Sequence, residues 1–115
     1  MQVQIFGIRK SATTRKALRF FAERRVPVHF VNLQERPASP GELRRFVQRF
    51  GADALVDREA RRLADLGLGS ARLSAERWVD TLAEEPLLLR MPLVRFEQQL
   101  TIGEAEPTWR EWVAR

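Results

Sequence analysis

The chain contains no cysteine and a single histidine, His29. Without cysteine it can form no disulfide, hold no metal through thiolates and perform no thiol catalysis. One histidine is too few for a zinc site built from histidines. We therefore expect no metal and no other cofactor in this protein.

Long apolar runs are also missing. No stretch of about 18 apolar residues is present, so no membrane-spanning helix is expected. Residues 1–4 lack a charged region followed by an apolar core, so we expect no signal peptide and a cytoplasmic location. Apolar residues still make up 44% of the 115 residues, which is enough for a packed core. The length predicts one domain that spans residues 1–115.

The net charge is +5, with a pI near 11.1, and arginine supplies nearly all of the positive charge. The arginines are dispersed, as in the pairs 24–25, 44–45 and 61–62, and acidic residues lie between them. No block of five or six like charges occurs, which is typical of solvated helix faces. This pattern does not favour direct nucleic-acid binding.

The first third of the chain predicts a parallel βαβ unit. Residues 3–6 form a short apolar strand, and a helix follows Ser11 and runs to about residue 25. Apolar side chains recur in that helix at helical spacing, which predicts one buried stripe. Residues 28–33 form the second strand. A strand, a helix and a strand joined by a long crossover are typical of parallel pairing.

Serine residues mark the starts of two further helices. Ser39 is followed by Pro40 and Glu42, which predicts a capping box with proline at the first helical position. Leu43, Phe46, Val47 and Phe50 are expected to face inward, and Gly51 ends this helix. Ser74 is the predicted cap of a later helix.

The remaining segments are expected as short helical pieces in residues 52–66, a third strand in 90–96, a fourth strand in 100–103 and a final helix that begins at Pro107. The order is then strand, helix, strand, several helices, strand, strand, helix. This is a thioredoxin-like, glutaredoxin-like α/β topology with a helical insertion at about 39–88. We expect a four-stranded mixed sheet, with the first and last helices on one face and the inserted helices on the other.

Four segments taken in order resemble the arsenate reductase-like (ArsC/Spx) family over essentially the whole chain. They are residues 6–17, 55–58, 86–94 and 101–103 together with 107–112. The resemblance implies a nucleophilic cysteine at the position that Ser11 occupies. It also implies a basic pair, matched by Arg15 and Lys16, and a cis peptide bond before Pro92.

The chain departs from the arsenate-reducing pattern at two positions. Ser11 stands where the family has its cysteine, and a serine hydroxyl needs an adjacent base to act as a nucleophile. Arsenate-reducing members place arginine immediately before the cis proline, whereas this chain has Met91 there and Arg90 one position earlier.

The loop around Ser11 is the candidate site. A helix N-terminus presents free N–H groups and partial positive charge, which favour oxyanions. The candidate anion-binding residues are Arg9, Lys10, Ser11, Thr13, Thr14, Arg15 and Arg90. The alternative is that Ser11 is only an N-cap. We interpret His29 as a structural or surface residue, and Trp78, Trp109 and Trp112 as core or interface residues.

Two functions remain open. The first is a non-catalytic binding or regulatory module with a protein partner, with a vestigial site for a small oxyanion. The resemblance extends to regulators that bind RNA polymerase, which makes RNA polymerase a candidate partner. The second is an arsenate reductase-like or glutaredoxin-like oxidoreductase that uses an external thiol such as glutathione. The missing cysteine favours the first.

Overall fold

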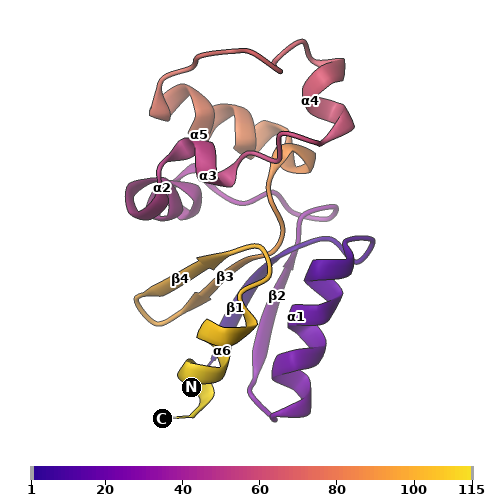
Figure 1. Cartoon of the computed structure of the whole chain (residues 1–115), viewed down its shortest axis with the longest axis vertical. Coiled ribbons are helices and arrows are strands. Elements are labelled where there is room, and N and C mark those ends of the chain that lie inside the picture. Colours follow the sequence, from indigo (N-terminus) through magenta and orange to yellow (C-terminus); the bar gives the residue numbers. More distant parts are fainter. Residues whose placement is uncertain (1, 115) are drawn as a thin grey trace. The chain divides into compact units, whose positions relative to one another are not determined.

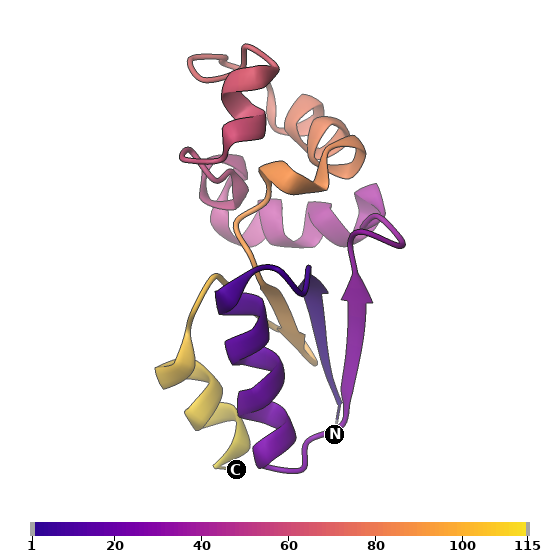
Figure 2. The same ribbon diagram turned by 90° about the vertical axis from the view of Figure 1, so that its right-hand side faces the viewer.

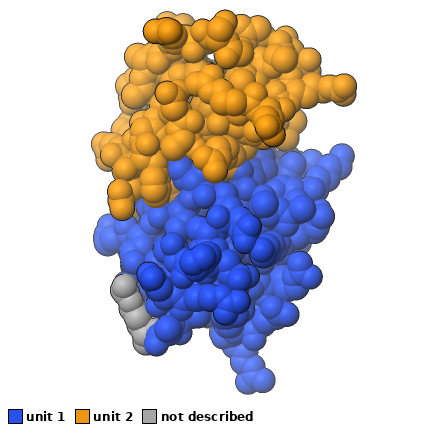
Figure 3. All heavy atoms as spheres, viewed as in Figure 1, with its two compact units in different colours: residues 1–36, 91–115 blue, residues 37–90 orange. Residues whose placement is uncertain are grey.

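The computed structural model describes residues 2–114 (Figure 1). The chain forms two compact units, one of residues 1–36 and 91–115 and one of residues 37–90 (Figure 3). No helix in the described part of the chain is long and apolar enough to cross a membrane.

The first unit is built on a four-stranded mixed sheet with the order β2-β1-β3-β4. Its central strand β1 pairs in parallel with β2 and antiparallel with β3, and β3 pairs antiparallel with β4. The strands are β1 (Val3–Gly7), β2 (Val28–Asn32), β3 (Leu93–Phe96) and β4 (Gln99–Ile102). The predicted pairings, including the contact of the first strand with the third, are confirmed.

Helices α1 (Ala12–Glu23) and α6 (Glu106–Val113) lie side by side on one face of this sheet (Figures 1 and 2). Phe20 and Phe21 of α1 contact the Trp109 ring of α6, with centroids 5.6 and 5.7 Å apart. The Trp109 indole N–H donates to Thr101 at 2.9 Å, so this buried ring has its one donor satisfied. The common face of the two helices is confirmed, whereas the expected position of the inserted helices stays a prediction.

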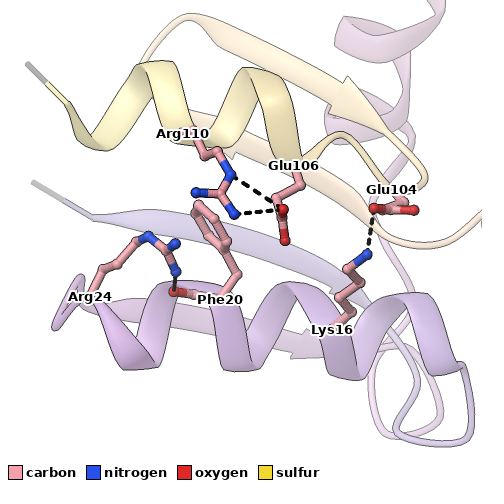
Figure 4. Close-up of polar contacts among 6 residues, drawn as sticks. All are labelled: Lys16, Phe20, Arg24, Glu104, Glu106 and Arg110. Carbon is pink, nitrogen blue, oxygen red and sulfur yellow. Dashed lines mark hydrogen bonds and ion pairs between the residues drawn. The ribbon is translucent and has the colours of Figure 1, made fainter.

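Ion pairs and hydrogen bonds occur on α1, on α6 and at Glu104, which precedes α6 (Figure 4). Lys16 forms an ion pair of 2.6 Å with Glu104, and Arg110 forms one of 2.9 Å with Glu106. The hydrogen bond from Arg110 lowers the pKa of Glu106, and the nearby charges of Lys16 and Arg24 act in the same direction. We call these four residues the rim: Lys16 links α1 to Glu104 just before α6, and the pair of Arg110 and Glu106 lies within α6.

The second unit is helical. Its helices are α2 (Pro40–Phe50), α3 (Ala52–Leu55), α4 (Arg61–Asp65), α5 (Ala75–Glu84) and the 3-10 turn η1 (Pro86–Leu88). Helix α2 packs against α3 and α5. The capping box at Ser39 is present, with both reciprocal hydrogen bonds, and Ser74 accepts the Arg77 N–H at the start of α5. Both predicted caps are thus confirmed.

Some expected details differ. Helix α1 ends at Glu23, because Arg25 adopts a left-handed φ of 57° that α-helix cannot accommodate. Strand β3 begins at Leu93, because Pro92 has no N–H with which to extend the ladder. Phe50, expected to face inward, is 37% exposed at the end of α2, where Gly51 turns the chain away.

The close approach of α1 to β1 requires glycine at position 7. A Cβ added to Gly7 would lie 2.3 Å from the Thr14 Oγ1 and 2.7 Å from its Cγ2. We expect Gly7→Ala to lower the free energy of unfolding by about 1–3 kcal/mol, since overpacking forces the two elements apart. Urea unfolding of the variant measures this loss.

The double variant Gly7→Ala/Thr14→Ala is the control, because it removes the two closest atoms. It should be less destabilised than the sum of the single variants, which is the sign of a direct contact. Strict additivity would contradict the contact.

Acid should weaken the rim of α1 and α6. Because the Glu106 pKa is lower in the folded chain, the unfolded chain binds more protons in acid. The stabilisation is therefore complete above the ordinary value of 4.5 and is lost as the pH falls through the folded pKa. We expect Glu106→Gln to lower the Tm at neutral pH and the difference from wild type to shrink in acid. A constant difference across the pH range would contradict this assignment.

Candidate functional site

The candidate site lies where β1 ends and α1 begins. Ser11 is the N-cap of α1, and its Oγ accepts the backbone N–H of Thr14 at 3.1 Å. The Thr14 side chain is fully buried against Gly7, and its hydroxyl has no hydrogen-bond partner among the described residues. The first turn of α1 is thereby fixed to the end of the strand.

Two hydrogen bonds in series connect the Ser11 cap to the Met91 carbonyl. The Thr13 hydroxyl donates to the Met91 carbonyl at 2.7 Å, and the Ser11 hydroxyl lies 3.0 Å from the Thr13 hydroxyl. A carbonyl oxygen can only accept, so Thr13 gives its hydrogen to Met91. Ser11 must then donate to Thr13. The Met91 carbonyl therefore fixes the direction of both hydrogen bonds.

In this arrangement the Ser11 hydroxyl both donates and accepts a hydrogen bond. Its hydrogen goes to Thr13, and its oxygen accepts the N–H of Thr14. The single histidine is elsewhere: His29 lies on β2 and its ring nitrogen contacts Gln4 at 3.5 Å. Because a serine nucleophile needs a base within hydrogen-bond reach, the geometry agrees with the capping interpretation of Ser11.

Three exposed cations, Arg9, Lys10 and Arg15, lie in or beside the connection of residues 8–11 between β1 and α1, which we call the α1 loop. The Arg9 guanidinium lies over the Phe30 ring, 4.9 Å from its centroid, and Arg15 donates to the Arg9 carbonyl at 2.7 Å. Lys10 is exposed at the tip of the turn. Neither contact neutralises a charge, so the loop keeps three positive charges beside a helix N-terminus.

Arg90 belongs to the second unit. Its side chain donates to the Ala54 carbonyl at 3.3 Å, and its backbone N–H donates to Leu55. The inclusion of Arg90 in the anion site with Ser11 therefore stays a prediction.

The Met91–Pro92 peptide bond is cis, as the resemblance implied. The Pro92 carbonyl accepts the N–H of Gly103 at 2.8 Å, which continues the β3–β4 pairing beyond the strands. The sequence did not reveal the role of the Met91 carbonyl, which accepts a hydrogen bond from the Thr13 hydroxyl. Backbone acceptors carry no residue-type signal, so only the folded chain could identify it.

The sheet order β2-β1-β3-β4, the two helices on one face and the cis proline opposite the N-terminus of α1 define a thioredoxin-like fold. The chain belongs to the ArsC family, whose model matches residues 6–112.

Similar proteins include transcriptional regulators and reductases. The global transcriptional regulator Spx 2 of Oceanobacillus iheyensis is 25% identical over 117 residues, which cover 100% of this chain and 86% of that protein. An arsenate reductase from Vibrio cholerae has a TM-score of 0.83 at 24% identity, with 96% of this chain and 97% of that one covered. An ArsC family related protein from Bacteroides fragilis has a TM-score of 0.85 at 17% identity, with coverages of 96% and 97%. The structural likenesses show the fold.

A cysteine placed at position 11 should report the electrostatics of this loop. The first turn of α1 carries no acidic residue, and the cap accepts a backbone N–H. We expect Ser11→Cys to carry a thiol with a pKa below the ordinary value of about 8.5. Because the chain has no other cysteine, thiolate absorbance against pH measures this pKa directly.

Ser39→Cys is the matched control. Ser39 is also an N-cap that accepts the backbone N–H three residues on, but Glu42 lies in its first turn. The negative charge of Glu42 should leave the thiol pKa higher there than at position 11. Equal pKa values at the two caps would show that the cations of the α1 loop do not act on position 11.

Proposed function

We propose that this ArsC-family chain is a non-catalytic binding or regulatory module. The observation that carries the proposal is that the Ser11 hydroxyl, at the position where the family resemblance implies a cysteine, is hydrogen-bonded to Thr13 and to the backbone N–H of Thr14. In this proposal the fold around the site is retained, and the Ser11 hydroxyl serves as the cap of α1.

Thiol chemistry gives the physical reason. Reduction of arsenate or of a disulfide through the protein needs a sulfur that attacks, forms a covalent intermediate and is then released by a second thiol. The chain has no sulfur nucleophile, since its only sulfur atoms are in two methionines. An external thiol such as glutathione would have to supply every sulfur in the reaction.

The cations around the loop favour a partner with an acidic surface. Arg9, Lys10 and Arg15 are exposed, and their charges are close together at the start of α1. Charged patches of this kind steer association and choose among partners more than they add affinity. Among relatives, the Spx proteins are named as global transcriptional regulators. By that resemblance we infer that RNA polymerase is a candidate partner.

A reductase assay tests the non-catalytic part of the proposal. We expect purified protein to show no arsenate or disulfide reduction above the buffer rate with glutathione, with or without added glutaredoxin. Turnover that rises in proportion to the wild-type protein concentration would overturn the proposal and support the reductase alternative.

A binding assay with purified RNA polymerase from the native cell tests the partner. We expect Arg9→Glu/Lys10→Glu to weaken binding at least tenfold, because reversed charges repel an acidic surface. Arg45→Glu/Arg49→Glu is the control, since it reverses two charges on the exposed part of α2 in the other unit. Equal losses in both double variants would indicate only the overall charge. No binding by the wild type would exclude this partner.

Arg90 is tested separately by titration of sulfate against Arg90→Glu. Loss of sulfate binding with unchanged polymerase binding would place Arg90 in a vestigial anion site apart from the partner surface. If neither ligand responds, Arg90 lies outside both sites.

A further inference from the structure

The second unit contains a hollow of about 500 Å³, which is separate from the candidate site at the α1 loop. It is lined by residues of α3, the segment that follows it, the irregular segment 70–73 and α5. Its volume lies within the range of about 300–1,000 Å³ that small-molecule sites occupy. The hollow is therefore large enough for a ligand with a ring and a charged group.

Arg58, which lines the hollow, is held in place by two contacts. The Arg58 guanidinium lies over the buried Trp78 ring, 5.6 Å from its centroid, and donates to the Asp53 carboxylate at 2.8 Å. Stacking on an aromatic ring restricts the plane of the guanidinium, and the carboxylate restricts its rotation. Arg58 thus presents a flat cationic surface in a defined place.

The lining also carries an unpaired charge. Arg72 and Ser70 belong to the segment 70–73, both are exposed, and neither forms an ion pair or side-chain hydrogen bond with the described residues. The lining therefore holds two guanidinium groups and the single carboxylate of Asp53. Leu73 adds an apolar side chain from the same segment.

We propose that this hollow binds a small anion that carries a planar apolar group, either a carboxylate or a phosphate monoester. Arg72 and the Ser70 hydroxyl hold the anionic group, because a guanidinium matches the two oxygens of a carboxylate or phosphate. The planar group lies against Leu73 and the Arg58 guanidinium. The inference is independent of the proposed partner of the α1 loop.

Trp78 offers a direct readout by NMR. It is the one tryptophan of the second unit, whereas Trp109 and Trp112 donate their indole N–H groups to Thr101 and Gln99 in the first. On addition of phenyl phosphate or benzoate, we expect the Trp78 indole signal to shift in a saturable way and the other two indole signals to stay. Inorganic phosphate lacks the planar apolar group and benzyl alcohol lacks the anionic group, so each should bind at least tenfold more weakly.

Arg72→Gln should weaken binding of the better of the two aromatic anions at least tenfold. Arg45→Gln is the matched control, because Arg45 is an exposed arginine of the same unit outside the hollow. Saturation with phenyl phosphate alone or benzoate alone identifies the anionic group. Equal effects of the two substitutions, or an unmoved Trp78 signal with both probes, would overturn the proposal.

Discussion

The hydrogen bonds from Ser11 through Thr13 to the Met91 carbonyl join the N-terminus of α1 to the peptide bond before the cis proline. Thr13 and Met91 are separated by 78 residues in sequence, so this contact ties the start of α1 to the entrance of β3. The carbonyl can only accept, and that single fact orients both hydroxyl groups. The Ser11 cap and the carbonyl before the cis proline are thereby held together.

The same connection explains how the scaffold accommodates a serine at this position. A serine oxygen is a preferred acceptor for an N-cap, and it satisfies an N–H that the helix leaves free. The Thr13 hydroxyl then takes the remaining hydrogen, so no polar group of Ser11 is left without a partner. Structural roles at a helix N-terminus need only an acceptor, whereas thiol chemistry needs sulfur.

Charge is used differently at the two places that we propose as binding sites. At the α1 loop, Arg9 and Arg15 contact a ring and a carbonyl, which orient them without removing their charge. In the hollow of the second unit, Arg58 forms an ion pair with Asp53, whereas Arg72 has no ion-pair partner among the described residues. Two further arginines of that unit are paired, Arg44 with Glu76 and Arg62 with Glu85. The basic composition alone therefore says little, because some arginines are held in ion pairs and others are not.

The sequence by itself determined the order of the elements, the caps at Ser11, Ser39 and Ser74, and, through family resemblance, the cis bond at Pro92. These features depend on side chains a few residues apart or on a short motif, so local chemistry specifies them. Only the tertiary structure decided that Thr13 meets the Met91 carbonyl and that Phe50 is exposed. It also brought Arg58, Arg72 and Trp78 to one hollow. Such contacts join segments that are distant in sequence, and packing, rather than periodicity, selects them.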